Sequence, residues 1–158
     1  MAEMNIEHIN PFLIATKSVL QNMCNLELNA GAPYVKSERF DASTTVICLG
    51  VVGQIKGQVL LAFKNEVACD IASKMCMGMP VPELDDMALS ALCELGNMVF
   101  GNAATVLSTK NILIDITPPS IIQGNFRIET NYAQNICIPF TYEGDKTIEV
   151  DVSLRAEG

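Results

Sequence analysis

The chain has 158 residues, of which 49% are hydrophobic, and this size predicts a single domain (residues 1–158) that buries a core. Its 18 acidic and 10 basic residues give a net charge of -8, which argues against binding to a nucleic-acid backbone. No apolar run approaches the roughly 20 residues of a membrane helix, and the N-terminus lacks a basic export signal, so we expect a cytoplasmic protein outside the membrane.

The first predicted element is a helix over residues 11–23. Apolar side chains recur there at helical spacing, and Phe12 and Val19 fall on the side expected to pack on the core. Asn10 directly before Pro11 is typical of a helix cap followed by a first-turn proline. We therefore expect the helix to begin at this point.

Three strands and a short helix are expected next. The segments 34–39, 44–52 and 55–63 are strand-like in composition. Gly53 and Gln54 form a tight hairpin turn between the last two strands. Asn65 is then expected to cap a short helix that ends near Gly78.

A long helix is predicted over Leu84–Ser108, because this stretch contains no proline and follows the breaks at Pro80 and Pro82. Asp85 and Asp86 lie at its start, where negative charge suits the positive end of the helix dipole. It is the central helix of the expected fold.

The rest of the chain predicts strands at 112–116 and 126–130, then a final pair joined by a turn at 143–145. In the last strand, apolar residues from Ile148 to Leu154 alternate with polar ones, which predicts one exposed sheet face. The polar set is Glu149, Asp151, Ser153 and Arg155. The order of elements indicates an α+β fold, with helices packed on one mostly antiparallel sheet.

The long helix has two chemically different faces. At about 100° per residue, one apolar stripe is expected to face the core; it contains Leu84, Ala88, Leu92, Leu95, Val99 and Val106. A separate stripe contains Ser90, Glu94, Asn97, Gly101 and Ser108. Glu94 and Asn97 are three residues apart, so a partner meets a carboxylate and an amide side by side.

Other residues of this helix need an explanation. Gly96 and Gly101 each cost about 1 kcal/mol relative to alanine, and either close packing or access for a partner can account for them. Asn102 is expected to point toward the apolar stripe in a structural role. Leu89, Phe100 and Leu107 form a second apolar flank, expected to pack under another helix.

Several kinds of chemistry lack their usual residues. The 6 cysteines form no C-x-x-C pair, which favours reduced core thiols. His8 is the only histidine, so a zinc site or a histidine-based triad is incomplete. We expect no metal ligands, and chemistry that depends on carboxylates, amides or a partner's own groups.

Two motifs together suggest a family. Segment 84–98 contains Ser-x-x-x-Glu-x-x-Asn at Ser90, Glu94 and Asn97, and segment 115–119 ends in a pair of prolines. With the glycines of the predicted hairpin, these motifs resemble the CheC/CheX/FliY chemotaxis phosphatases, and most closely the CheX type. The likeness covers the whole chain.

A second Glu-x-x-Asn match occurs at Glu7 and Asn10. CheC-type members carry two such helices, whereas the CheX type carries one. Asn10 precedes proline, which disfavours helical backbone, and the flanking residues of the family are missing. We therefore predict that this copy does not display its side chains as Glu94 and Asn97 do.

The resemblance implies a CheC-like fold, a homodimer and hydrolysis of the phospho-aspartate of a CheY-like response regulator. It implies that Asn97 orients the attacking water and that Glu94 pairs with the receiver's active-site lysine, with Ser90 and Gly101 on the same partner-binding face. No cofactor of the chain's own is implied, because the Mg belongs to the phosphorylated response regulator.

Two other classes of function stay open. One is a non-catalytic domain that binds a receiver or sits in a flagellar-switch-like assembly, although related switch proteins lack the Glu/Asn pair. The other is a structural or redox-responsive dimerisation domain with exposed cysteines. Phosphate release from a phosphorylated receiver separates the first from a phosphatase, and thiol labelling tests the second.

Overall fold

The computed structural model of the chain describes residues 6–35, 39–128 and 134–156. Its helices in these residues are α1 (Ile6–Cys24), α2 (Asn65–Met75) and α3 (Asp86–Thr109). Its strands are β1 (Asn29–Ala30), β2 (Tyr34–Val35), β3 (Arg39–Phe40), β4 (Thr44–Gly53), β5 (Ile55–Lys64), β6 (Ile114–Ile116), β7 (Ser120–Gln123), β8 (Phe126–Arg127), β9 (Ile136–Tyr142) and β10 (Lys146–Ala156).

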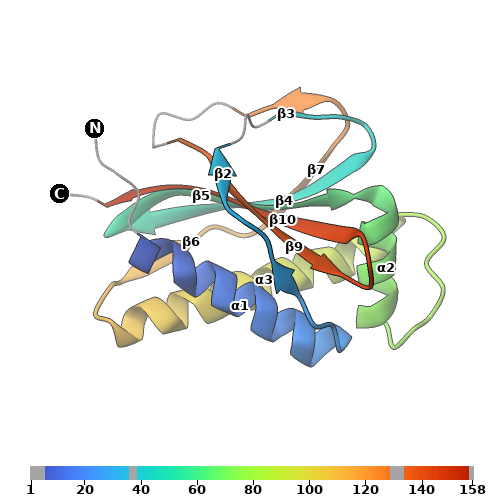
Figure 1. Ribbon diagram of the computed structural model, residues 1–158, viewed down its shortest axis with the longest axis horizontal. Helices are drawn as coiled ribbons and strands as arrows, with labels where there is room; N and C mark the ends of the chain where they lie inside the picture. Colours follow the sequence, from blue (N-terminus) through green and yellow to red (C-terminus); the bar gives the residue numbers. More distant parts are fainter. Residues whose placement is uncertain (1–5, 36–38, 129–133, 157–158) are drawn as a thin grey trace.

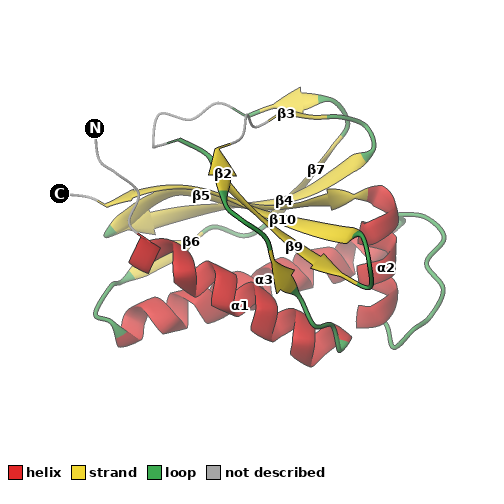
Figure 2. Cartoon of the chain, in the orientation of Figure 1, coloured by secondary structure: helices red, strands yellow, loops and turns green. Residues whose placement is uncertain are grey.

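A large antiparallel sheet forms the middle layer of the molecule. Its strands follow the order β1-β9-β10-β5-β4-β6, with β2 also paired to β9 and β7 to β4. Helices α1 and α3 lie side by side under this sheet, and α2 stands at one end of it (Figures 1 and 2). The predicted α+β fold, with helices on one antiparallel sheet, is confirmed.

The main core fills the space between the helices and the sheet. The predicted apolar face of α1 is confirmed, because Phe12 and Val19 are buried there, and the rings of Phe12 and Phe100 lie 6.4 Å apart. The apolar residues of β10, from Ile148 to Leu154, face the same core. Helix α3 therefore packs against α1 on one side and against the sheet on another, which fixes the side that it turns outward.

The opposite face of the sheet has a cover of its own. Phe40, Val46, Leu60 and Ala62 form a second apolar cluster there, and β3 pairs with β8 so that Phe40 stacks on Phe126 with ring centroids 5.0 Å apart. The prediction of an exposed face is wrong for Asp151 and Ser153, which are buried. The pattern of one strand does not reveal which other segments fold over it.

Helix α1 begins earlier than predicted. It starts at Ile6, so Asn10 is helical and Pro11 lies inside the helix rather than at its first turn. The argument that Pro11 keeps Asn10 out of the helix is therefore wrong. Pro11 lacks the N–H for one hydrogen bond of the helix, and its fixed φ of about -65° is compatible with helical backbone.

Asn65 has a different role from the predicted cap. Its Oδ1 accepts a hydrogen bond from Thr45 Oγ1 at 2.7 Å, and its Nδ2 donates to the carbonyl oxygen of Ala42 at 3.0 Å. The helix makes no side-chain cap bond at its start, and it ends at Met75 rather than near Gly78. Asn65 thus ties α2 to the chain that enters β4.

The long strands predicted at 44–52 and 55–63 are confirmed, and the shorter strands differ from the prediction. Gly53 closes the β4–β5 hairpin with φ of 120°, and the last two strands join at 143–145 as expected. Segment 34–39 contains two short strands instead of one, and positions 36–38 and 129–130 of the predicted strands lie outside the described residues. Strands β1 and β7 were not predicted.

No helix in the described part of the chain is long and apolar enough to cross a membrane.

Candidate functional site

The start of α3 is fixed by its own sequence. The backbone of Asp85 is extended, and its side chain accepts a hydrogen bond from the N–H of Ala88 at 2.9 Å, which makes Asp85 the N-cap. Asp86 lies in the first turn, as predicted. The helix runs from there to Thr109 without a break, so the spacing of its side chains follows regular helical geometry.

The predicted partner-binding side chains share the outward face of α3. Ser90, Glu94 and Asn97 are exposed, and Gly101 is partly exposed one turn further on. Among the residues that the structure describes, neither the Glu94 side chain nor the Asn97 side chain has a hydrogen bond or an ion pair. An approaching molecule therefore meets a free carboxylate and a free amide within about one helical turn.

The two glycines of α3 have different explanations. A Cβ atom at Gly96 would lie 2.9 Å from Cγ2 of Ile47 and 3.3 Å from Cβ of Pro119, so close packing accounts for this glycine. At Gly101 nothing lies within 4 Å of such an atom. Packing therefore does not explain Gly101. What this glycine provides is open space above the helix.

The two sequence motifs meet in space at Gly96. Pro119 reaches α3 on the side next to Asn97, and the segment that carries it is fixed to β4. The N–H of Thr117 donates to the carbonyl oxygen of Gly50 at 3.0 Å, and the N–H of Gly50 donates to Oγ1 of Thr117 at 2.8 Å. The Thr117–Pro119 segment thus lies next to the helical turn that carries Glu94 and Asn97.

The rotation of α3 differs slightly from the sequence prediction. Phe100, Ala103 and Leu107 are fully buried, whereas Val106 is only half-buried and Asn102 is exposed. The buried face is turned toward the predicted second flank, which is part of the core. The expectation that Asn102 points inward is therefore wrong, and it is a solvent-facing amide on the same helix as Asn97.

Glu7 and Asn10 are both exposed on α1, contrary to the expectation for this second match. Their environment differs from that of Glu94 and Asn97. A proline follows Asn10 directly, and the serine four residues before the glutamate is missing. The two copies share the Glu-x-x-Asn spacing on a helix, but the residues around them differ.

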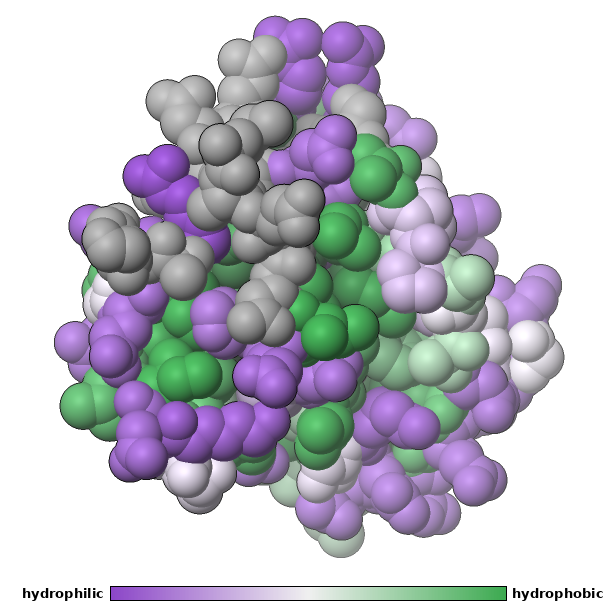
Figure 3. Space-filling view, turned by 60° about the vertical axis from the view of Figure 1, so that its left-hand side comes forward, coloured by the Kyte–Doolittle hydropathy of each residue, from purple (hydrophilic) through white to green (hydrophobic). Residues whose placement is uncertain are grey.

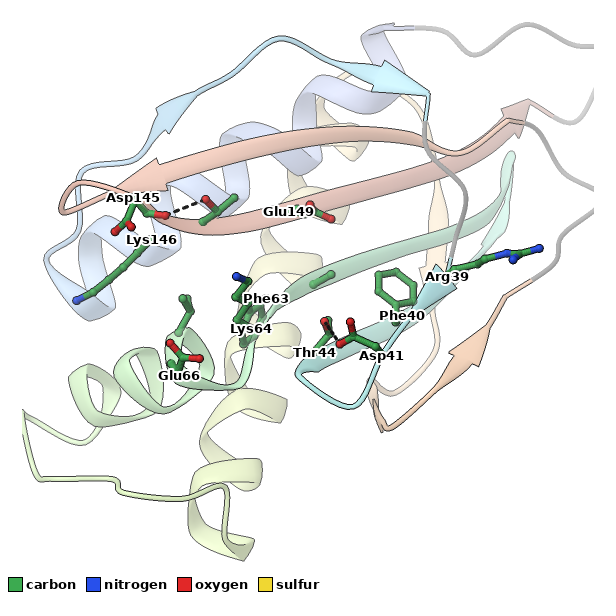
Figure 4. Close-up of a pocket in the computed structure, with 13 residues that line it drawn as sticks. Arg39, Phe40, Asp41, Thr44, Phe63, Lys64, Glu66, Asp145, Lys146 and Glu149 are labelled. Atoms are coloured by element: carbon green, nitrogen blue, oxygen red, sulfur yellow. Dashed lines mark hydrogen bonds between the residues drawn. The ribbon is translucent and has the colours of Figure 1, made fainter.

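A hollow of about 520 Å³ lies over the outer face of the sheet, away from α3 (Figure 4). Two of its charged residues have partners within the protein. Asp41 accepts hydrogen bonds from Ser43, and Lys146 lies 3.6 Å from Asp70 and 3.4 Å from Glu143. The hollow does not include Glu94 or Asn97 among the residues that line it.

The cysteines of the chain are free thiols. Burial raises the pKa of Cys24 to about 11, and burial together with the nearby Asp151 raises that of Cys137 to about 12, although a hydrogen bond from Tyr34 acts in the opposite direction. Cys137, Glu149 and Asp151 lie close enough together to surround a cation, on the face of the sheet away from the helices. High thiol pKa values are typical of unreactive core cysteines.

Comparison with known proteins links the chain to chemotaxis proteins. Residues 45–141 match the family model described as chemotaxis phosphatase CheX. A Thermotoga maritima protein, named CheY-P phosphatase CheX, is 26% identical over 155 residues, which cover 98% of this chain and 100% of that protein.

Solved structures show the same likeness over nearly the whole chain. A CheC-like superfamily protein from Shewanella sp. PV-4 is 32% identical, with a TM-score of 0.84, over 98% of this chain and 100% of that one. A chain of the CheX-CheY-BeF3-Mg complex from Borrelia burgdorferi is 34% identical, with a TM-score of 0.80, over 96% of this chain and 99% of that one.

Proposed function

Because the chain belongs to the family of CheX chemotaxis phosphatases, we propose that it hydrolyses the phospho-aspartate of a CheY-like response regulator, in chemotaxis or related two-component signalling. The observation that carries this proposal is the exposure of Glu94 and Asn97 together on one face of α3. A receiver that docks on this face can take both side chains into its phosphorylation pocket.

Asn97 is proposed to orient the attacking water. Phosphoryl transfer depends mainly on positioning and on stabilisation of charge, so a correctly placed water is the chief requirement that a second protein can meet. A carboxamide offers both a donor and an acceptor, and it does not titrate near neutral pH. Asn97 can therefore hold a water by its carbonyl oxygen while its NH2 group faces the phosphoryl oxygens.

Glu94 is proposed to pair with the lysine of the receiver's active site. Such a pair fixes the register in which Asn97 enters, and it acts on docking and specificity more than on the chemical step. Ser90 lies one turn before Glu94 and extends the contact. Gly101 lies one turn after Asn97, where the open space above it leaves room for the receiver's loops.

The metal ion of the reaction is proposed to come with the receiver. The structure of the Borrelia burgdorferi relative is a complex with CheY, BeF3 and Mg. The exposed face of α3 has one carboxylate within reach of such a pocket, Glu94, which is too few for a divalent cation of its own. The chain is proposed to need no cofactor.

The test is release of phosphate from a phosphorylated CheY-like receiver, measured with and without the protein. Asn97→Ala should abolish the acceleration, and Asn97→Asp should also do so, because it replaces the amide donor with a negative charge near phosphate. Asn102→Ala is the matched control, since Asn102 is also an exposed amide on α3. Full activity of Asn97→Ala would refute the assignment.

A receiver-binding domain without catalysis is the alternative function. The same assay distinguishes it: the protein would then bind the phosphorylated receiver and leave the rate of phosphate loss unchanged. The presence of both Glu94 and Asn97 favours the phosphatase.

We also propose a homodimer in the cytoplasm. Large apolar side chains are exposed outside α3: Ile6 is 64% exposed, Val35 63% and Leu113 66%. Figure 3 shows apolar side chains in green that reach the surface among hydrophilic ones. A second copy of the chain can cover such residues. Sedimentation of the purified protein measures the oligomeric state, and a monomer at all concentrations would contradict the proposal.

A further inference from the structure

Helix α3 packs closely on the sheet at Gly96, the residue before Asn97, where a Cβ atom would lie 2.9 Å from Ile47. We propose that the contact of Gly96 with Ile47 and Pro119, here called the Gly96 seat, sets the position of Asn97 for attack by water. This inference rests on the proposed function, and it assigns positioning residues to it. None of the three residues touches the reacting atoms.

Ile47 forms the first wall of the seat and has little freedom to move. It is fully buried in the middle of β4. Its strand is paired on both sides, with Ile47 opposite Leu61 of β5 and Ile121 of β7. Its Cγ2 atom would lie 2.9 Å from a Cβ at Gly96, a distance that real Cβ atoms almost never show. The helix can therefore approach the sheet this closely only with glycine at position 96.

Pro119 forms the second wall and is fixed at both ends of its segment. Thr117 exchanges two hydrogen bonds with Gly50 of β4, at 3.0 and 2.8 Å. Ser120 pairs with Cys48 on the same strand. Two consecutive prolines between these points restrict the backbone further. The wall opposite α3 is thus a short connection between β6 and β7 that is fixed to β4 on both sides of its prolines.

The seat determines where Asn97 lies. Gly96 is buried and Asn97 is exposed, so a shift of the helix at Gly96 moves the amide relative to a docked receiver by a similar distance. The reaction depends on a water held in line with the phosphoryl group. Displacements well under 1 Å reduce such rates, since a misplacement of 1 Å costs about 100-fold.

The first test is Gly96→Ala, which adds one methyl group to the buried side of α3. The kcat for a phosphorylated receiver should fall about tenfold, with KM unchanged, because the exposed side chains that dock the receiver stay chemically the same. Alanine is a better helix former than glycine, so α3 should stay intact in this variant, and an unfolding experiment checks this. Asn102→Ala serves as the control with parental kcat.

The second test is rescue by Ile47→Leu. Leucine keeps the volume of isoleucine but lacks the Cγ2 methyl group that a Cβ at position 96 would meet. The double variant should recover part of the kcat that Gly96→Ala loses. A third variant, Thr117→Val, keeps the shape of the side chain and removes the oxygen that accepts from Gly50, and it should lower kcat in the same direction.

The outcomes separate this inference from the proposed function. If the parent protein does not accelerate phosphate release, the proposed function fails. If the parent is active and Gly96→Ala keeps the parental kcat, the seat does not position Asn97. If Gly96→Ala lowers stability and raises KM along with its loss of kcat, or if Ile47→Leu gives no recovery, Gly96 has a structural role only. The Thr117→Val variant decides the question where Gly96→Ala does not fold.

Discussion

Glu94 and Asn97 offer a phosphorylated partner two different interactions from one helical turn. Glu94 presents a full negative charge in solvent, where salt screens it, and Asn97 presents a neutral donor and acceptor. Removing the first should affect how well the partner is held. Removing the second should affect the chemical step. Kinetic measurement of KM and kcat separates the two roles.

For Glu94 the informative change is Glu94→Gln, which keeps the size of the side chain and removes its charge. We expect KM for the phosphorylated receiver to rise about tenfold, because a hydrogen bond between charged groups is lost, with a smaller change in kcat. The variant should also be less sensitive to salt. Glu66→Gln on α2 is the control, and an equal effect in that variant would rule out a specific contact at Glu94.

At the scale of elements, α3 is held at its first turn by the Asp85 cap and in its middle by the Gly96 seat. Helix α2 is held in another way: its residue Asp70 contacts side chains next to the turn between β9 and β10. Asp70 Oδ2 accepts a hydrogen bond from the Tyr142 hydroxyl at 2.7 Å, and Lys74 Nζ lies 3.0 Å from Oδ1. Helix α2 is thus fixed to the sheet through Tyr142, and α3 through the Gly96 seat, besides their apolar faces.

The Asp85 cap should contribute measurably to stability. Asp85→Ala removes the acceptor for the N–H of Ala88 and should lower the free energy of unfolding by about 1 kcal/mol in chemical denaturation. Asp86→Ala is the matched control, since it removes a carboxylate from the same turn without removing the capping bond. Equal losses in both variants would mean that charge, not the cap, stabilises the start of α3.

The Asp70 contacts predict a pH dependence. Partial burial raises the pKa of Asp70, but the hydrogen bonds from Tyr142 and Lys74 outweigh it and leave the pKa below its usual value. A lowered pKa in the folded state stabilises the fold above the unfolded pKa of about 3.9, and this contribution is lost as pH falls further. Asp70→Asn should therefore cost about 1 kcal/mol at pH 7, and less below pH 4.

Thermal unfolding of the parent protein and of the Asp70→Asn variant, from pH 7 to below pH 4, measures this difference in stability. The figure of about 1 kcal/mol is modest because the Asp70 side chain is 24% exposed and solvent weakens its ion pairs. A difference between the two proteins that stays constant down to pH 3 would contradict the role of the Asp70 carboxylate.

The sequence predicts helices and strands well where a pattern of apolar residues repeats over many consecutive positions. The 24-residue α3 and strand β10 show clear periodicity, and the exposure of Glu94 and Asn97 follows from the helical spacing. The difference between Gly96 and Gly101 could not be predicted. It depends on Ile47 and Pro119, which only the folded chain brings beside α3.

At the scale of the whole molecule, both faces of the sheet are covered, by helices on one side and by β3 and β8 on the other. Phe40 and Phe126 are far apart in the chain, and their pairing has no local signal. Asp151 and Cys137, which pair across β10 and β9, are also buried. The sequence of one strand does not reveal such long-range packing.

Thiol labelling tests this packing. Cys24 and Cys137 are buried, with pKa values raised by burial to about 11 and about 12, so neither should react with an alkylating reagent at pH 7 while the protein is folded. Both should react in denaturant. Mass spectrometry of the labelled peptides makes the measurement, and fast reaction of these two thiols in the folded protein would revive the redox-responsive reading.

The exposed face of α3 carries a carboxylate, an amide and a hydroxyl, and no imidazole. Imidazole is the side chain whose charge ordinarily changes between about pH 5 and 8. For the proposed activity, this chain thus adds no acidity sensor to the decay of its partner's signal. The lifetime of that signal would depend on how many copies of the protein the cell makes, and hardly on shifts in its internal pH.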